Sequence, residues 1–346
     1  MPGNASQTYL TTRAAVLSRR LLDARALEEM LQRPLEQLAG ELQLIELLES
    51  GAPEANINRA VERALIHALM LEFTVLIRPL HGAGRNILVH WIRKFELYNL
   101  KALIRGKIYG HTHREIEDNL HDLPPMISLP HKQLLATEGV AELLRQLDEG
   151  HYSDIARQAR RVYEEKNEPF SLDAAIDQRY YTALLKQARA TESADRDDLL
   201  RLIGTLIDHQ NLMWLLRYRL NYNLPPTVTY YLLIPFGRQL QRDRLKQLAN
   251  LNTLEEVIDA LPETLATPLT QAGDIETVRR RMGARTLEEV RHQLRYSKSA
   301  LTRSLAYLVI READLKKVFA IIQGRILNLD QEMIRQAAGI REGAHV

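Results

Sequence analysis

The feature that most constrains the fold is a helical block that occurs three times. Residues 96–107 read ELYNLKALIRGK, residues 208–219 read DHQNLMWLLRYR, and residues 314–325 read DLKKVFAIIQGR. In each block the apolar residues recur at spacings of three and four, which is typical of an amphipathic helix. The blocks start 112 and 106 residues apart, close to one third of the 346-residue chain. Three diverged copies of one helical unit are the economical explanation.

The aligned polar positions are more informative than the leucines, because amphipathic helices resemble one another by chance. An acid opens each block, Asn or Lys follows three positions later, and a base closes each block. A glycine precedes that base in the first and third copies. The positions that we expect to serve the structure or a partner interface are Glu96, Asn99, Arg105, Gly106 and Lys107 in the first copy, Asp208, Asn211, Arg217 and Arg219 in the second, and Asp314, Lys317, Gly324 and Arg325 in the third.

The glycine and the charges of the first block pose a packing problem. Gly106 costs about 1 kcal/mol relative to alanine inside a helix, so it indicates either close approach of a neighbouring backbone or a helix that loosens before Gly110. Glu96 and Lys107 share one largely apolar stripe, but eleven residues of helix separate them by about 16 Å. Their partners must therefore lie outside their own helix. Internal hydrogen-bonded pairing is the usual solution for buried charges, and contact with another protein is the alternative.

The rest of the chain is also predicted to be helical. Aromatic residues make up only 6%, and strand patterns are nearly absent. Residues 227–234, TVTYYLLI, are interpreted as the start of a helix after a Pro-Pro turn. The longest uncharged run, residues 220–237, contains three prolines and is therefore unsuited to a membrane-spanning helix. We expect a soluble, intracellular, all-α protein.

Residues with catalytic chemistry do not form a recognisable pattern. The chain lacks cysteine, and its net charge of +2 is too balanced for a dedicated nucleic-acid binder. His111, His113 and His121 are interpreted as solvated loop histidines rather than metal ligands. HGAGRN, residues 81–86, is read as a turn between helices, because no strand precedes it and the P-loop Lys-Ser/Thr is missing. We therefore predict no catalytic residue, no cofactor, no metal, no nucleic acid and no small-molecule substrate.

Several motifs together resemble a known family. NLKALIRGK, NLMWLLRYR and KKVFAIIQGRILNLDQEMIR are similar to the three Asn-Leu-(x)4-Arg-Gly-Lys helices of the C subunit of V-type and A-type ATP synthases, the family that includes the d subunit of the eukaryotic vacuolar ATPase. IDQRYYTALL, IPFGRQL and the opening helix with Tyr9, Arg13 and Leu21-Leu22 resemble further parts of that family. The departures are Tyr218 for the family's Gly, Lys317 for its Asn and Gln323 for its Arg.

The resemblance implies a fold and a function. It implies three pseudo-symmetric helical subdomains arranged as a funnel, here placed at residues 1–122, 123–226 and 227–346. It also implies a non-catalytic rotor protein at the cytoplasmic face of the membrane. That protein links the central shaft, made of the D and F subunits, to the membrane proteolipid ring and transmits torque. The alternative is a helical-repeat scaffold that binds proteins, but its repeats would be about 20 to 50 residues long rather than domain-sized.

Overall fold

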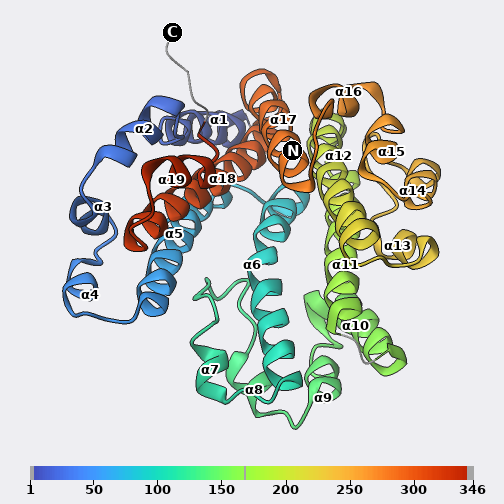
Figure 1. The fold of residues 1–346 in the computed structure, drawn as a ribbon, viewed down its shortest axis with the longest axis horizontal. Helices are drawn as coiled ribbons and strands as arrows, with labels where there is room; N and C mark the ends of the chain where they lie inside the picture. Colours follow the sequence, from blue (N-terminus) through green and yellow to red (C-terminus); the bar gives the residue numbers. More distant parts are fainter. Residues whose placement is uncertain (1–3, 167–168, 341–346) are drawn as a thin grey trace. The chain divides into compact units, whose positions relative to one another are not determined.

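The protein is all-α, as the sequence predicts. A computed structural model describes residues 4–166 and 169–340, and within these ranges helices form throughout while no β-strand does (Figure 1). An isolated bridge between Phe236 and Gln241 is the one strand-like feature of the described residues. Residues 227–234 fall largely on the helix α13 (Pro226–Leu232), which begins after Pro225 as expected.

The chain forms two compact units, of which the first combines both ends of the sequence. Unit 1 comprises residues 1–80, 121–124 and 303–346. Its helices are α1 (Asn4–Ser18), α2 (Ala24–Gln32), α3 (Leu35–Glu41), α4 (Ile45–Glu49), α5 (Glu54–Ile77), nearly all of α18 (Ala300–Ile326) and α19 (Gln331–Ala337).

Unit 2 comprises residues 81–120 and 125–302. The predicted division into three subdomains stays a prediction. The helices of unit 2 are α6 (Gly82–Ile108), α7 (His113–Glu117), α8 (His131–Ala136), α9 (Val140–Arg145), η1 (Gly150–Tyr152), α10 (Ser153–Lys166), α11 (Pro169–Arg189), α12 (Ser193–Leu216), η2 (Arg217–Asn221), α13, α14 (Arg242–Ala249), α15 (Leu254–Asp259), α16 (Glu263–Ala266), η3 (Thr267–Leu269) and α17 (Ile275–Tyr296).

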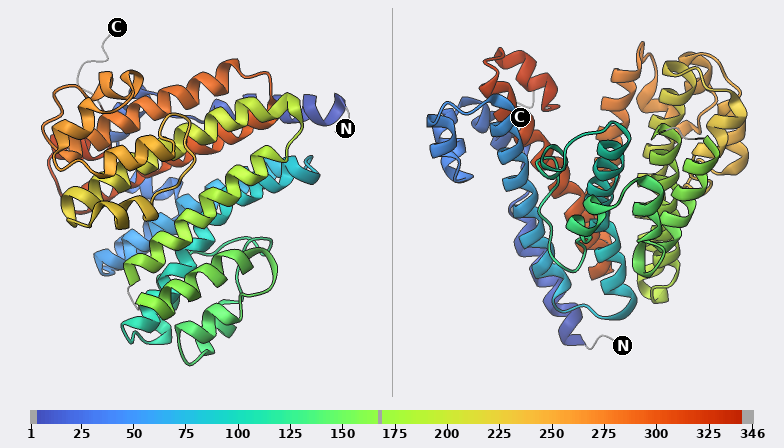
Figure 2. Two further views of the ribbon diagram at one scale, coloured as in Figure 1. Left: turned by 90° about the vertical axis from the view of Figure 1, so that its right-hand side faces the viewer. Right: turned by 90° about the horizontal axis from the view of Figure 1, so that it is seen from below.

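The three blocks lie at the C-terminal ends of three long helices, which we call the repeat helices. The first block lies on α6, the second on α12 and the π-helical turn η2, and the third on α18. Within unit 2, α11 packs against both α6 and α12, α13 packs against α11 and η2, and α14 packs against α13; α13 and α14 are gold in Figure 2. The apolar stripe of the first block, Leu100, Leu103 and Ile104, is fully buried.

A polar seam joins α6 to α11 inside unit 2. The Nε2–H of His90 donates to the carbonyl of Tyr180 (3.0 Å), and the hydroxyl of Tyr180 donates to the carbonyl of Trp91 (2.9 Å). Burial lowers the pKa of His90 to about 4, so the ring is neutral at pH 7. Lys101 and Asp177 add an ion pair at 2.8 Å between the same two helices. Tyr180 belongs to IDQRYYTALL, so this motif serves helix packing.

Unit 1 is tied together by a buried carboxylate. Glu72 on α5 is 4% exposed and accepts hydrogen bonds from the Tyr307 hydroxyl and from Nε of Arg311 (3.1 Å), both on α18. Nη1 of Arg20 approaches the second oxygen at 3.3 Å. A buried carboxylate with this many donors is strongly held, because removing them would leave its charge uncompensated.

Two sequence expectations are corrected by the fold. HGAGRN does not form a turn between helices, because Gly82 is the first residue of α6 and most of the stretch is that helix's first turn. His121 is not a solvated loop residue, since only 7% of it is exposed and burial lowers its pKa to about 4.

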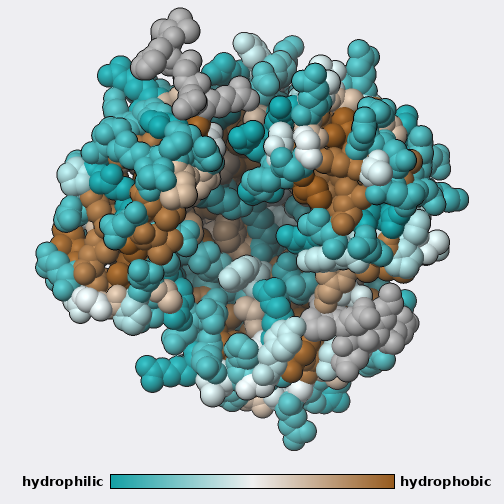
Figure 3. All heavy atoms as spheres, in the orientation of Figure 1, coloured by the Kyte–Doolittle hydropathy of each residue, from teal (hydrophilic) through white to brown (hydrophobic). Residues whose placement is uncertain are grey.

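Elsewhere α4 contributes no residue to the core, and apolar surface lies over the region of α3 and α4 (Figure 3).

Candidate functional site

The opening acid of the first block holds a backbone segment just before a short helix. Glu96 on α6 is fully buried, and one carboxylate oxygen accepts the N–H of Leu129 (2.6 Å) and faces Nε2 of His131 (2.7 Å). Its other oxygen accepts Nδ2–H of Asn99 (3.1 Å). Leu129 lies two residues before the first residue of α8, so Glu96 acts at the N-terminal side of that helix.

The opening acid of the second block makes the equivalent contact. Asp208 on α12 is 1% exposed and accepts the N–H groups of Gln239 (2.9 Å) and Leu240 (3.0 Å), just before α14. Gly237 in the same IPFGRQL turn packs against the Asp208 carboxylate so closely that a Cβ would collide with it. Burial raises the pKa of Asp208 to about 6, although these N–H donors act in the opposite direction.

The opening acid of the third block reaches the other end of the sequence. Asp314 on α18 is fully buried and accepts the N–H of Leu22 (2.9 Å), 292 residues away along the chain. Leu22 precedes Asp23, the N-cap of α2. Both partners belong to unit 1. The third copy therefore completes the pattern of the first two by using a short helix from the start of the chain.

The closing bases act on the opposite ends of the same three short helices. Nζ of Lys107 donates to the carbonyls of Leu135 (2.9 Å) and Thr137 (2.6 Å), at the end of α8. The guanidinium of Arg219 donates to the carbonyl of Leu251 (3.2 Å) and the side chain of Asn252 (2.8 Å), after α14. The guanidinium of Arg325 donates to the carbonyls of Leu31 and Arg33 (both 3.2 Å), at the end of α2.

We call this arrangement an end clamp: one repeat helix holds one short helix by its two ends. The acid lies beside the N-terminus and the base beside the C-terminus, so both charges complement the dipole of the short helix. The acid and the base lie about 16 Å apart along the repeat helix, whereas the short helices have six to nine residues and span about 9 to 14 Å, so several of the contacts fall on residues just outside the short helices. The three pairs are α6 with α8, α12 with α14, and α18 with α2 (Figure 1).

The residues three positions after each acid have different roles. Asn99 donates a hydrogen bond to Glu96, as described above. Asn211 instead donates its Nδ2–H to the carbonyl of Ile234 and accepts the N–H of Ile234 at its Oδ1, both at 2.8 Å. Lys317 is half-buried on α18. Among the arginines before the glycine position, Arg105 forms an ion pair with Asp173 at 3.3 Å and Arg217 is exposed. The central polar position thus has a different environment in each copy.

The two glycines of the blocks allow close packing by a side chain. Gly106 is buried against Ile116, and a Cβ added to it would collide with the isoleucine side chain. A Cβ on Gly324 would lie 2.6 Å from Cγ1 of Ile334. Ile116 and Ile334 each occupy the fourth residue of the helix that follows, α7 and α19. The close approach expected at Gly106 is therefore made by a side chain rather than by a neighbouring backbone.

The second copy replaces this pair with residues of inverted size. Tyr218 stands where the other copies have glycine, and Thr229 is the fourth residue of the following helix α13. Both are buried, at 4% and 0% exposure. The chain here takes an extra residue in the π-helical turn η2, so the N–H of Leu224 donates to the carbonyl of Tyr218 (2.8 Å) one position later than in the other copies.

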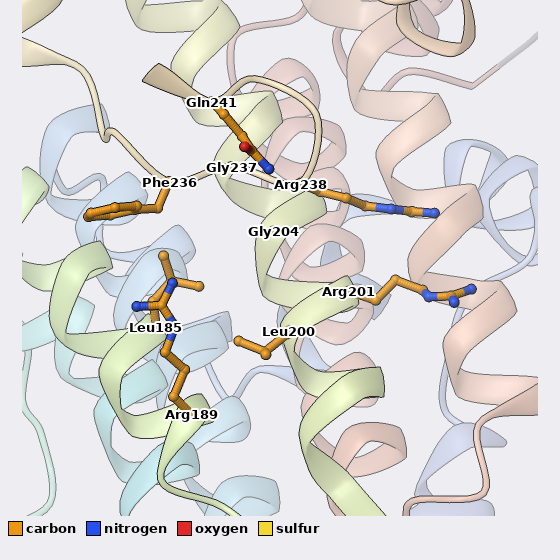
Figure 4. A pocket seen from close by; sticks show the side chains of 9 residues that line it. All are labelled: Leu185, Arg189, Leu200, Arg201, Gly204, Phe236, Gly237, Arg238 and Gln241. Atoms are coloured by element: carbon orange, nitrogen blue, oxygen red, sulfur yellow. The ribbon is translucent and has the colours of Figure 1, made fainter. Parts of the chain in front are cut away.

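A shallow pocket lies where the IPFGRQL turn meets α11 and α12 in unit 2 (Figure 4). Its volume is about 340 Å³. The side chains of Arg201 and Arg238 extend to one side while Arg189 lies near Phe236, so the guanidinium groups do not converge on one point. Arg238 is already paired with Glu289 at 3.0 Å. The lining residues are Leu185, Arg189, Leu200, Arg201, Gly204, Phe236, Gly237, Arg238 and Gln241.

The clamp partners are what sequence reasoning missed. In the structure each acid and each closing base contacts backbone groups, and two side chains add to these contacts: His131 at Glu96 and Asn252 at Arg219. No sequence motif identifies backbone N–H or C=O groups in advance. The leucines near the ends of α2, α8 and α14, whose backbone groups the clamps contact, have no sequence pattern that marks them as partners. Among the residues that the structure describes, no group of three or more His, Asp or Glu residues is arranged to hold a metal ion.

The described residues form an all-α protein in which the acids and closing bases of the three sequence blocks hold short helices of the same chain. The chain belongs to the ATP synthase (C/AC39) subunit family, whose family model matches residues 10–337. It is thus a subunit of a rotary ATPase, and the resemblance seen in the three blocks is confirmed. No helix in the described part of the chain is both long and apolar enough to cross a membrane.

Curated relatives agree over most of the chain. The C subunit of the A-type ATP synthase of Methanocaldococcus jannaschii is 26% identical, covering 96% of this chain and 86% of the relative. The corresponding protein of Methanosarcina barkeri is 22% identical, with 96% of this chain and 92% of the relative covered. That of Haloferax volcanii is 23% identical over 85% of this chain and 88% of its own length.

Proposed function

We propose that this chain is a non-catalytic central-stalk rotor subunit that links a D/F-type shaft to a membrane proteolipid ring and transmits torque between them. In this proposal it sits peripherally on the cytoplasmic side of the ring, and its three pseudo-symmetric helical subdomains, residues 1–122, 123–226 and 227–346, are arranged as a funnel. The proposal rests on the family and on one structural observation, the three end clamps.

An end clamp suits a part that carries mechanical load. Torque is lost wherever a short helix can shift against a long one, and each clamp fixes both ends of the short helix. Lys107, for example, holds two carbonyls at 2.9 and 2.6 Å, and Glu96 lies at zero exposure. Such buried polar contacts are costly to break, because each broken contact leaves an unsatisfied group at a cost of about 1 to 3 kcal/mol.

The proposal is tested by separating ATP hydrolysis from ion pumping. The complex is isolated from native membranes through a tag on this chain, and ring and shaft proteins are expected to copurify with it. Membranes from a strain lacking the chain are expected to lose ATP-driven ion pumping, while the detached catalytic sector still hydrolyses ATP. Re-expression of the intact chain is the control.

The opposite outcomes are equally clear. If the tagged chain runs alone, or if membranes without it pump ions at the normal rate, it is not the rotor link. If the purified chain itself hydrolyses ATP, its role is not purely mechanical.

A further inference from the structure

Exposed apolar side chains gather directly after the three repeat helices. The described residues include twelve exposed large apolar side chains, and six of them fall within residues 109–117, 222–232 and 327–337. These short segments form a small part of the chain, so the concentration is far above an even spread. The six residues are Tyr109, Tyr222, Tyr231, Leu327, Leu329 and Met333.

One of these residues occupies the same place in every copy. Tyr109, Tyr222 and Leu327 are 65%, 51% and 41% exposed, respectively. Each stands immediately before the residue that ends the helix with a positive φ: Gly110 (70°), Asn223 (50°) and Asn328 (51°). The extra residue of η2 shifts the second copy by one position, and the exposed apolar residue shifts with it.

The backbone that presents these side chains is fixed. In the first and third copies the N–H groups of His111 and Leu329 donate to the carbonyls of Gly106 and Gly324, both at 2.9 Å, which closes the helix end. The clamping bases lie two or three residues earlier in the chain. Each exposed side chain therefore projects from a turn that needs little ordering on binding, which favours affinity.

We propose that Tyr109, Tyr222 and Leu327 are three equivalent docking points for a ring of identical subunits. This deepens the proposed function, on which it rests, by assigning the ring-contacting end of each repeat helix. Each point is complete within its own unit, the first two in unit 2 and the third in unit 1.

The recurrence identifies the kind of partner. A partner with one asymmetric surface would meet each copy with different chemistry and would not require the same exposed residue three times. A ring of identical subunits offers the same apolar contact repeatedly, so equivalent residues in equivalent positions fit it. Tyrosines that become buried in an interface are among the residues that supply most of its affinity, and two of the three positions are tyrosines.

The absence of cysteine in the chain makes a direct test possible. Single variants Tyr109→Cys, Tyr222→Cys and Leu327→Cys are labelled with a benzophenone maleimide, reassembled with membranes stripped of this protein, and irradiated. All three are expected to crosslink to the same small ring protein. Leu71→Cys and Tyr296→Cys, which replace apolar residues of 57% and 69% exposure outside the three segments, are the matched controls.

A binding measurement completes the test. Tyr109→Ser, Tyr222→Ser and Leu327→Ser are each expected to weaken rebinding to the stripped membranes by about tenfold. The melting temperature should stay unchanged for Tyr109→Ser and Leu327→Ser, whereas Tyr222→Ser also removes an edge-on contact with Phe170 and should lower it slightly. Crosslinks to a shaft protein or to different proteins, labelling equal to that of the controls, or unchanged rebinding would each overturn the inference while leaving the rotor function intact. If the unmodified chain does not rebind at all, the proposed function itself fails.

Discussion

The ends of α6 and α12 solve the same packing problem with opposite residues. At the end of α6, glycine lies under the isoleucine of α7, whereas at the end of α12 a tyrosine accompanies the threonine of α13. The third copy follows the first, with Gly324 under Ile334. In all three the acid and the base keep their hold on a short helix.

The difference shows which part of the repeat is replaceable. At these two aligned positions the larger residue has changed place, and a core tolerates exchange that keeps total volume and shape. The acid and the base of an end clamp cannot change places in this way. Backbone N–H groups at one end of a helix require an acceptor, and backbone C=O groups at the other end require a donor. The extra residue of η2 is the adjustment that accompanies the larger Tyr218.

The largest effect is expected from giving the second copy the glycine of the others. Tyr218→Gly removes a buried ring that packs edge-on against Phe170, with centroids 5.0 Å apart, and leaves a cavity. We expect the free energy of unfolding to fall by about 4 kcal/mol in denaturant titration. Tyr231→Ala, at a 75% exposed position, is the control and is expected to cost about 0.5 kcal/mol or less. A loss below about 1 kcal/mol for Tyr218→Gly would contradict the volume exchange.

The reverse change in the first copy is expected to be smaller but specific. Gly106→Ala forces Ile116 to move and should cost about 2 to 3 kcal/mol. Combining it with Ile116→Thr imitates the second copy, and the double variant should be at least about 1 kcal/mol more stable than the sum of the single effects predicts. Gly139→Ala is the control, because no heavy atom lies within 4 Å of its Cβ position. Strict additivity would show that the two residues do not share one packing site.

The acid of the second clamp should make stability depend on pH. Burial raises the pKa of Asp208 from 3.8 to about 6, so the folded state binds this proton more tightly than the unfolded state. Its stabilising contribution is full below about pH 4 and is lost as the pH rises through about 6. Relative to Asp208→Asn, the free energy of unfolding of the natural protein should therefore fall by about 2 to 3 kcal/mol over that range.

The control for this titration keeps Asp208 in place. Asp243→Asn alters an exposed carboxylate on α14 and should retain the pH dependence of the natural protein. If Asp208→Asn also retains it, the titration belongs to another group.

The sequence predicts the helices and the three blocks well, because both depend on local periodicity. It locates the acids and bases of the clamps but not their partners, since these are mainly backbone groups of α2, α8 and α14. The third partner is the least predictable, because Leu22 and Asp314 are 292 residues apart. The π-helical turn at Arg217–Asn221 is also beyond the local pattern. Tyr218 marks that place as a departure, but the matching threonine becomes visible only once the following helices are aligned.

The central claim, that each base holds one particular short helix, is best tested by native-state hydrogen exchange. Lys107→Met and Arg219→Met each remove one set of hydrogen bonds to helix-end carbonyls while keeping much of the side-chain volume. Lys107→Met is expected to speed exchange about tenfold in α8 and to leave α14 unchanged, and Arg219→Met should do the reverse. Equal changes in both helices, or no change in either, would contradict the end clamps.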